Sequence, residues 1–368
     1  MANIKVAVIV PQVLGRNGIG FMAVMYRSAP FLRDKGLHLD FIRHLSSRRV
    51  FDYDVCIVPN KVILQDLRHK ESHQKIQELF TQLRENGTRI IFYDMNDDST
   101  TGHWSILPYV DVYCKSYVLK KRHLYLKAYY GRRIWTDYYH SKFGVVDAVE
   151  KYSELPPKNH LYKIKTGFLL GLYNCDPRSF LVRFPGALDH VAWSRFFRSV
   201  PSQTSFFPPS RTRPVPISCR FVMYEQQRTI NFQRECVAEL LKPLASTQKV
   251  NIRKYIEELR SSKVVVSPFG WGEINVRRDY EAAMNGTVLV KPSIEHIDTY
   301  PPLFNNNTIV QVSWDFSDFF DTVDDVLVNY REQIWKAEEL QDRLRFYLAT
   351  EEGWMDVAEH VARCIMDK

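Results

Sequence analysis

The chain has 368 residues, of which 45% are hydrophobic and 25% are charged, and its formal net charge is +8. The composition is ordinary for a globular protein, and the length exceeds the roughly 250–300 residues at which a single core stops growing, so two domains are expected. No run of about 18 apolar residues occurs, which excludes a membrane-spanning helix. The positive charge is scattered along the sequence, as expected for a solvated basic face, for contact with anionic lipid or for phosphorylated ligands.

The first half of the chain alternates strand-like and helix-like patterns, which predicts a parallel sheet with helices on both faces. Helices are predicted over Phe21–Lys35 and about Asp66–Asn86, and each pattern stops at a glycine. Strands are predicted over Ile4–Val10, Leu37–Ile42, Tyr53–Pro59, Arg89–Tyr93 and Val110–Cys114.

The pattern breaks from about Tyr173 to Pro216, where prolines interrupt any long element, and it resumes afterwards. Helices are then predicted over Phe232–Leu244, Val250–Arg260 and Glu273–Asn285, with a mostly helical end over about Phe319–Met366. Strands are predicted over Arg220–Tyr224, Val264–Ser267, Thr287–Lys291 and Thr308–Val312.

These elements predict an α/β protein of two Rossmann-like αβα domains that face a central cleft. We expect an acceptor-side domain over residues 1–200 and a donor domain over 201–351, with a C-terminal helix over about 352–368 packing back onto the first domain. Ligands of such sheets bind outside the carboxyl ends of the strands. The cleft between the halves is therefore the expected site.

The six cysteines form no C-x-x-C pair and no zinc-like spacing. We expect them to be reduced and mostly structural, as in a cytosolic protein. The N-terminal apolar run is short and is interpreted as a first core strand rather than a signal peptide. A cytoplasmic location is expected, with peripheral contact to a membrane as an open alternative.

The stretch from Val264 to Pro292 carries the strongest functional pattern, because a buried strand, a glycine-rich turn, a charged helix and a second buried strand follow one another. Gly270, Trp271 and Gly272 form the turn, and glycines let a backbone approach a ligand closely. The helix predicted after the turn would present unpaired N–H groups, which suit a diphosphate.

Charged side chains on this predicted helix suit the rest of a nucleotide sugar. Glu273 and Glu281 are separated by seven residues, which places them on nearly the same helix face, where carboxylates can accept hydrogen bonds from sugar and ribose hydroxyls. Arg277 and Arg278 suit phosphate. Each residue alone is more commonly part of a solvated helix face, but the whole arrangement favours a donor site.

Two family resemblances rest on these residues. The segment Glu281-Ala-Ala-Met-Asn-Gly286-Thr-Val-Leu-Val-Lys-Pro292 resembles the Glu-Ala-…-Gly-Thr-Pro-Val-Val segment of group 1 glycosyltransferases, which have the GT-B fold. The run from Tyr255 through Ser267-Pro268 to Gly286 also resembles exostosin-like glycosyltransferases. Both resemblances are confined to about Ile252–Val312.

The resemblance implies a hexosyl- or pentosyltransferase that uses a nucleotide-diphosphate sugar donor and a glycan or lipid-linked acceptor, with no cofactor and no essential metal. It would place Glu281 at the donor ribose and Glu273 near the donor sugar. Arg228 and Arg234 are candidates for the diphosphate. The order Phe269-Gly-Trp-Gly-Glu273 departs from the group 1 pattern, so retention and inversion of the sugar both stay open.

Acidic residues after the fourth predicted strand are candidates for the acceptor side. Inversion needs a base that takes the acceptor's proton, and Asp94 directly follows that strand, with Asp97, Asp98 and His103 close behind. The alternative is a loop of Asx turns and a helix cap. Gly18, in the turn predicted over Gly15–Gly20, is a candidate for contact with the acceptor or the donor phosphate.

Other interpretations stay open. The protein would otherwise be a non-catalytic αβα module that binds a nucleotide or sugar, or a basic nucleic-acid-binding protein, although no nucleic-acid motif is present and no nucleic-acid partner is expected. An NAD-dependent oxidoreductase is disfavoured because the dinucleotide fingerprint is absent. The aromatic run Trp135–His140 is either a sugar-binding edge or a core strand.

Overall fold

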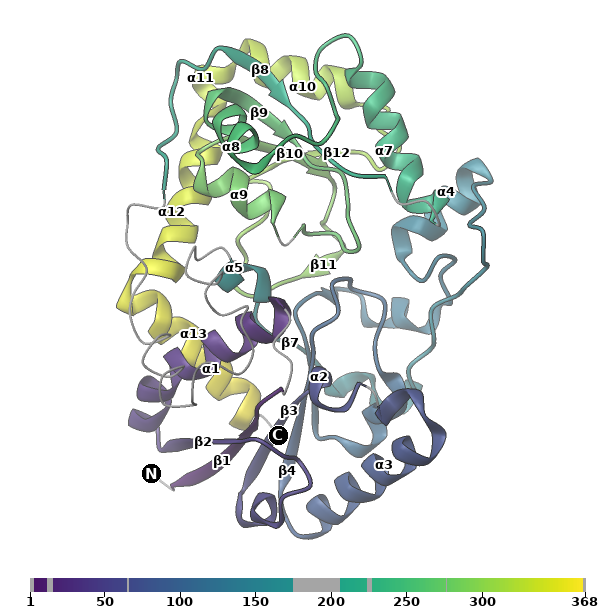
Figure 1. Ribbon diagram of the computed structural model, residues 1–368, viewed down its shortest axis with the longest axis vertical. Coiled ribbons are helices and arrows are strands. Elements are labelled where there is room, and N and C mark those ends of the chain that lie inside the picture. Colours follow the sequence, from purple (N-terminus) through teal and green to yellow (C-terminus); the bar gives the residue numbers. More distant parts are fainter. Residues whose placement is uncertain are drawn as a thin grey trace.

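The computed structural model describes residues 3–11, 16–64, 66–174, 206–223, 227–275 and 277–366. The chain forms two α/β units, one above the other in Figure 1, with the N-terminal unit below. The expected pair of Rossmann-like domains is confirmed. The predicted boundary between residues 200 and 201 lies outside the described residues.

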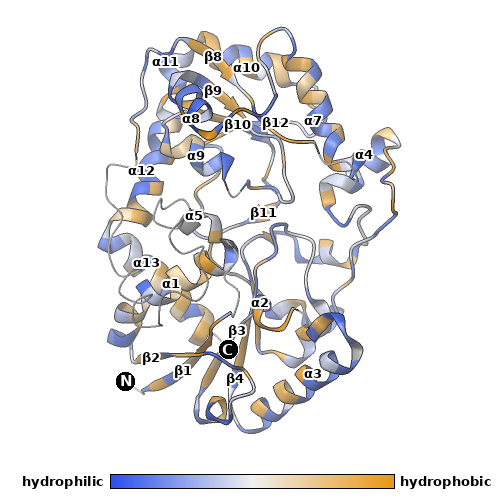
Figure 2. Cartoon of the chain, in the orientation of Figure 1, coloured by the Kyte–Doolittle hydropathy of each residue, from blue (hydrophilic) through white to orange (hydrophobic). Residues whose placement is uncertain are grey.

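The N-terminal sheet has six parallel strands in the order β2-β1-β3-β4-β5-β7. All five strands predicted for this half are present, and the additional β7 is too short to leave a pattern. The strands are β1 (Ile4–Ile9), β2 (Leu37–Ile42), β3 (Val55–Pro59), β4 (Arg89–Asp94), β5 (Val112–Lys115) and β7 (Ile164–Thr166). In Figure 2, β1, β3 and β4 are coloured mainly as hydrophobic, as expected for strands covered on both faces.

Helices cover this sheet and extend from it. They are α1 (Arg16–Asp34), α2 (Asn60–Ile63), α3 (Lys70–Glu85), α4 (Ile134–Phe143) and α5 (Leu170–Asn174), with short 3-10 turns η1 (Arg48–Asp52), η2 (Asp66–Arg68), η3 (Trp104–Tyr109), η4 (Arg122–Leu126) and η5 (Lys158–Lys163). The run Trp135–His140 belongs to α4, so the core-strand alternative there is wrong.

The C-terminal sheet has four parallel strands in the order β12-β10-β9-β8. They are β8 (Val215–Ser218), β9 (Ser262–Val266), β10 (Val288–Pro292) and β12 (Val310–Val312). Its helices are α7 (Arg228–Leu241), α8 (Ile252–Ser261), α9 (Arg278–Met284), α10 (Phe319–Val328), α11 (Tyr330–Gln333), α12 (Trp335–Ala349) and α13 (Glu351–Met366).

The first strand of this domain was misplaced in the prediction. The structure has β8 at Val215–Ser218, and the residues predicted as a strand from Arg220 onward are not one where they are described. Pro216, at the end of the predicted break, lies inside β8. It is accommodated because β8 is an edge strand, where a missing N–H costs no ladder bond.

The helix predicted over Glu273–Asn285 is also wrong at its start, since α9 begins only at Arg278. The Asn275 side-chain oxygen accepts from the backbone N–H groups of Arg277 (3.2 Å) and Arg278 (3.1 Å). The Asp279 carboxylate in turn accepts from the Asn275 N–H at 2.8 Å. These side-chain bonds hold the loop and satisfy backbone N–H groups at the start of the helix, so Glu273 lies outside it.

The turn predicted over Gly15–Gly20 is helical from Arg16 onward, which places Gly18 inside α1. Gly20 is needed for packing instead, because a Cβ there would lie 2.5 Å from the backbone oxygen of Leu170 in α5. Gly20 therefore serves a close contact between α1 and α5.

Several elements join the two domains. A two-stranded antiparallel ribbon pairs β6 (Val118–Leu119) with β11 (Ile297–Asp298). Helix α12 runs down from the upper domain in Figure 1, and α13 lies beside α1 of the lower one. There the Arg27 guanidinium lies 4.6 Å from the centre of the Trp354 ring. No helix within the described part of the chain is long and apolar enough to cross a membrane.

Candidate functional site

A cavity of about 440 Å³ opens beyond the carboxyl ends of β8 and β9. This is where ligands of open parallel sheets bind, and the volume is in the range of small-molecule sites. Of the residues predicted from the sequence, the structure brings together at this cavity Asp97, Arg234, Gly270, Trp271, Gly272, Arg277, Arg278 and Glu281. It does not bring the following predicted residues to the cavity lining: Gly18, Asp94, Asp98, His103, Arg228 and Glu273.

The cavity is richer in positive than in negative charge. Among the described residues, five cations and two carboxylates line it, the cations being Arg220, Arg234, Lys249, Arg277 and Arg278. Glu281 pairs with the Arg277 guanidinium at 3.3 Å. Arg220 is neutralised by Glu258, which accepts from Nε at 3.0 Å and from a terminal nitrogen at 2.7 Å.

Lys249 and Arg278 differ from these pairs. No carboxylate among the described residues lies within ion-pair distance of either one. The Arg278 guanidinium donates a long bond of 3.3 Å to the Pro268 carbonyl, and Lys249 is exposed. Both are therefore available to an anionic ligand, and charge-assisted bonds to phosphate are stronger than neutral ones.

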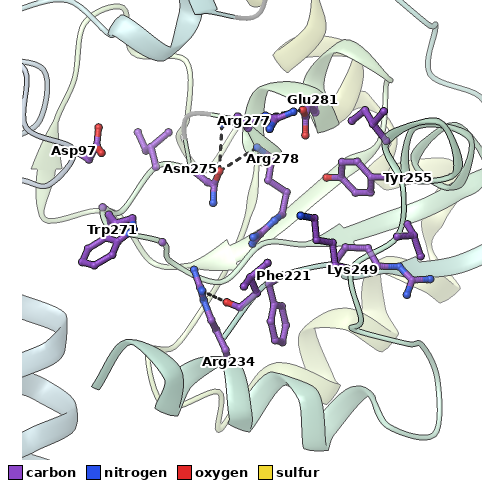
Figure 3. Close-up of a pocket in the computed structure, with 17 residues that line it drawn as sticks. Asp97, Phe221, Arg234, Lys249, Tyr255, Trp271, Asn275, Arg277, Arg278 and Glu281 are labelled. Atoms are coloured by element: carbon purple, nitrogen blue, oxygen red, sulfur yellow. Dashed lines mark hydrogen bonds and ion pairs between the residues drawn. The ribbon is translucent and has the colours of Figure 1, made fainter. Parts of the chain in front are cut away.

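Tyr255 supplies an uncharged polar group to the same region. Its side chain is 9% exposed, and its hydroxyl has no hydrogen-bond partner among the described residues. In Figure 3 the hydroxyl points into the space beside Arg278 and Lys249. Burial raises the pKa of this hydroxyl, so it stays protonated and able to donate. An unpaired buried hydroxyl costs free energy that a ligand's acceptor would recover.

Arg234 is buried and shapes the cavity wall. Its guanidinium donates to the Phe269 carbonyl from Nε at 3.2 Å and from a terminal nitrogen at 3.0 Å, and it also bonds the Val222 carbonyl. These bonds tie α7 to the glycine turn and to the segment after β8. Arg228 begins α7, is exposed and lies away from the cavity lining.

The glycine turn itself is in contact with the N-terminal domain. The N–H of Gly270 donates to the Gly272 carbonyl at 3.1 Å. The Trp271 side chain is exposed, its carbonyl accepts from the Arg133 Nε at 2.6 Å, and the Arg133 guanidinium lies 5.4 Å from its ring centre. The turn thus joins the cavity to the contact between the domains.

Glu273 lies in that contact rather than in the cavity. Its fully buried carboxylate accepts from the Ser99 hydroxyl at 2.6 Å and the Ser99 N–H at 3.2 Å, and it lies 3.4 Å from His296 Nε2. Burial alone would raise the pKa of this carboxyl, but His296 and Ser99 outweigh it and leave the pKa below the usual 4.5. Glu273 therefore links the two domains and does not line the cavity, and its place beside the donor sugar stays a prediction.

Asp94 is also fully buried, and both of its carboxylate oxygens accept hydrogen bonds. Its carboxylate accepts from Lys115 Nζ at 2.9 Å, from the Tyr113 hydroxyl at 3.0 Å and from the Asn96 N–H at 3.0 Å. Burial opposes ionisation, but Lys115 and the other donors hold the pKa below its usual 3.8. A carboxylate held in this way is a poor proton acceptor, so the structure disfavours Asp94 as the base.

His103 packs near this buried group. Its Nε2 lies 3.2 Å from the side-chain nitrogen of Asn60, which also donates to Asp94 at 3.3 Å. Burial lowers the pKa of His103 although Asp94 opposes the shift. The imidazole is therefore neutral at pH 7 and belongs to the interior of the loop rather than to the cavity.

Asp97 and Asp98 follow Asp94 in the same loop but differ in surroundings. Asp98 is buried, and its two oxygens accept from the backbone and hydroxyl groups of Thr100 and Thr101 at 2.7–3.1 Å. This is the turn-forming role that was the alternative in the prediction. Asp97 is half-buried and lines the cavity.

Some lining residues carried too little sequence signal to be predicted as site residues. They are Arg220, Phe221, Val222, Lys249, Val250, Ile252, Tyr255, Ile274 and Asn275. Most belong to the segment after β8 or to the start of α8. Arg220, Phe221 and Val222 were predicted to lie in a strand, so they were not considered as residues of a loop beside a ligand. The segment from Lys249 to Tyr255 precedes a strand and faces the turn only once the sheet has formed. No group of three or more His, Cys, Asp or Glu side chains suited to a metal occurs in the described ranges.

Comparisons with known proteins give a distant likeness only. No protein-family model matches the sequence, and no curated protein matches it. Among solved structures, HepE from Anabaena in complex with UDP is similar at 9% identity and a TM-score of 0.43, with 100% of both chains covered. A glycosyltransferase from Rickettsia africae has 10% identity and a TM-score of 0.41, again with 100% of both chains covered. Sucrose-phosphate synthase from Thermosynechococcus elongatus has 10% identity and a TM-score of 0.40, with 98% of this chain and 99% of that one covered.

Proposed function

We propose that the protein is a glycosyltransferase that binds a nucleotide-diphosphate sugar in the cavity beside Gly270–Gly272 and transfers the sugar to a glycan or lipid-linked acceptor, without an essential metal. The observation that carries the proposal is the combination of Lys249, Arg278 and the unpartnered Tyr255 hydroxyl in one cavity of nucleotide size. Two cations without a carboxylate partner among the described residues, together with a donor hydroxyl, suit the oxygens of a diphosphate ester.

The proposed arrangement follows the charges. The diphosphate lies against Arg278 and Lys249, where positive charge stabilises the leaving group as the glycosidic bond breaks. Glu281, partly exposed at the same wall, accepts hydrogen bonds from the ribose hydroxyls. The sugar then extends toward Trp271 and Asp97, at the opposite end of the cavity in Figure 3, and the acceptor approaches from the N-terminal domain.

Binding of nucleoside diphosphates tests the phosphate part of the proposal. We expect Arg278→Gln to weaken UDP, GDP or ADP, whichever the wild type binds most tightly, by about 10-fold or more, since a charge-assisted bond contributes about 1.5–3 kcal/mol. The corresponding nucleoside should be affected far less. Isothermal titration calorimetry of both ligands gives the comparison. Equal loss for nucleoside and diphosphate, or no binding of any diphosphate by the wild type, would contradict the proposed site.

The ribose contact is tested separately. We expect Glu281→Ala to weaken the ribonucleoside diphosphate by roughly 10-fold and the 2′-deoxy analogue by much less, because only the former presents both hydroxyls. Glu257→Ala is the control, since this exposed carboxylate on the neighbouring helix α8 does not line the cavity. If both ligands weaken equally with Glu281→Ala, the loss reflects the freed Arg277 instead of a ribose contact.

A further inference from the structure

The loop after β4 presents three carboxylates, and only one of them faces the cavity. Asp94 and Asp98 have both oxygens engaged by neighbouring donors. Asp97 has one oxygen, Oδ1, held by the Asn17 side-chain nitrogen at 2.9 Å. No described residue bonds its other oxygen. This carboxylate is therefore oriented but still able to accept.

Asp97 also lies at the meeting point of the two domains. Among the described residues that line the cavity, it comes from the N-terminal domain and the others come from the C-terminal one. Figure 3 shows Asp97 and Trp271 at one end of the cavity and Tyr255, Lys249 and Glu281 at the other. A donor with its diphosphate on the cations would direct its sugar toward Asp97.

Several contacts hold the loop that carries Asp97. Asn17 of α1 donates to both Asp97 and the Met95 carbonyl, each at 2.9 Å. Lys115 joins the buried Asp94 to the Thr101 carbonyl, at 2.9 and 2.5 Å. The Asp97 backbone oxygen lies against Gly272, where a Cβ would be only 1.6 Å away. The carboxylate is thus fixed relative to the glycine turn of the other domain.

The environment makes this carboxylate a better base than an exposed one. Burial raises the pKa of Asp97. The Asn17 bond and the charges of Lys61 and Arg133 lower it, but burial and the neighbouring Asp98 charge outweigh them, and the pKa stays above its usual value. A base is more effective as its pKa approaches the working pH, provided it remains ionised there. The pKa of Asp94 is lowered instead, so Asp94 is the weaker base of the two.

We propose that Asp97 is the catalytic base of an inverting transfer. The proposal rests on the proposed function. The acceptor oxygen forms a bond to the anomeric carbon on the face opposite the diphosphate, and its proton passes to the free Oδ2 of Asp97. The bond from the anomeric carbon to the diphosphate oxygen breaks, and its electron pair leaves with the nucleoside diphosphate beside Arg278 and Lys249. Asp97 then releases the proton to solvent.

Hydrolysis of the donor tests this step without knowledge of the acceptor, because water can serve as the acceptor. The probes are UDP-glucose, UDP-N-acetylglucosamine, GDP-mannose and ADP-glucose, and the one that the wild type hydrolyses fastest is used. Proton NMR at early times gives the configuration of the released sugar. We expect inversion from the wild type. Retention, or hydrolysis of none of the four, would overturn the proposal.

Asp97→Asn is the decisive variant, because it keeps the shape and the bond from Asn17 but removes the base. We expect a loss of turnover of about 10²–10⁴-fold, a change in nucleoside diphosphate affinity of less than about 3-fold, and loss of the rise in rate with pH that the wild type shows as Asp97 ionises. Asp97→Glu should recover part of the rate. Full activity or an intact pH profile in Asp97→Asn would overturn the assignment.

Asp98→Asn is the control for damage to the loop. Asp98 stabilises the same turn as Asp97 but does not line the cavity, so this variant disturbs the loop without removing the base. We expect it to lower the melting temperature yet retain the rise in rate with pH. The two proposals also fail differently. If the wild type binds no nucleoside diphosphate, the proposed function fails, whereas inverting hydrolysis that survives in Asp97→Asn leaves that function standing and removes only the role of Asp97.

Discussion

Gly270 and Gly272 lie in one turn but have different surroundings. A Cβ on Gly270 would meet the Asn275 side chain at 3.3 Å and the Arg234 side chain at 3.8 Å, which are contacts that side chains can relieve. A Cβ on Gly272 would lie 1.6 Å from the backbone oxygen of Asp97 and 2.5 Å from its carbonyl carbon. A glycine is therefore required at position 272 for the two backbones to touch.

We expect Gly272→Ala to destabilise the protein by about 1–3 kcal/mol, the usual cost of overpacking a tight contact, and to lower turnover because Asp97 moves away from the cavity. Gly270→Ala is the matched control and should cost little. Urea unfolding and sugar transfer or hydrolysis are the measurements. Equal effects of the two substitutions would show that the backbone contact at Gly272 is not what holds the turn.

The loop from Asp94 to His103 is shaped by the element ends around it. It leaves β4 at a buried carboxylate and is closed by Lys115, the last residue of β5. This ion pair is almost fully excluded from solvent. A buried pair is not evidence of high net stability, but removal of one partner leaves an uncompensated charge.

Lys115→Met is therefore expected to lower the free energy of unfolding by about 3–5 kcal/mol. Adding Asp94→Asn in the same chain should restore part of that loss, because the unpaired carboxylate is then gone. A double-mutant cycle by urea denaturation measures the coupling. Additive losses from the two single substitutions would indicate that Asp94 and Lys115 do not depend on each other.

The two domains are held together by polar contacts as well as by α12 and α13. Glu273 reaches Ser99 across the contact, and the Tyr139 hydroxyl of α4 donates to the Trp314 carbonyl at 2.7 Å. Asp315 accepts from Lys142 of the same helix, and this bond is the main cause of a lowered pKa of Asp315. Ionised carboxylates thus support the domain arrangement.

Stability should fall in acid for this reason. The pKa values of Glu273 and Asp94 are below their ordinary 4.5 and 3.8 in the folded protein, so the unfolded chain binds protons first as the pH drops. Their contribution is complete above about pH 5 and is lost as the pH falls through the unfolded and then the lower folded pKa values. Asp97 has the opposite shift and partly offsets them.

Melting temperatures measured from pH 7 down to about pH 3 test this expectation. The decline should begin below about pH 5 and be shallower in Glu273→Gln, which has no carboxylate to protonate. Asp34→Asn is a suitable control, because Asp34 is exposed at the end of α1. An unchanged pH dependence in Glu273→Gln would mean that this carboxylate contributes no acid sensitivity.

Elements whose signal is local could be predicted from the amino-acid sequence. The continuous apolar strands of both sheets, the glycine stops of α1 and α3, and the turn at Gly270–Gly272 were readable because each depends on neighbouring residues. The prediction that Glu273 and Glu281 lie on one helix face is wrong. The side-chain bonds of Asn275 and Asp279 make the helix begin at Arg278, five residues after the predicted start at Glu273. The edge position of β8, which allows Pro216, could not be predicted either, because it depends on the order of strands in the sheet.

Which charged side chains are available to a ligand depends on packing between distant parts of the chain. Asp94, Asp97 and Asp98 are equivalent carboxylates in the sequence, yet packing buries the first against Lys115, engages the third with Thr100 and Thr101, and leaves an oxygen of the second open to the cavity. Tyr255 and Lys249 join Arg278 at that cavity only once β9 and α8 are in place. Long-range contacts set burial and hydrogen bonding, and these determine the chemistry that a side chain can perform.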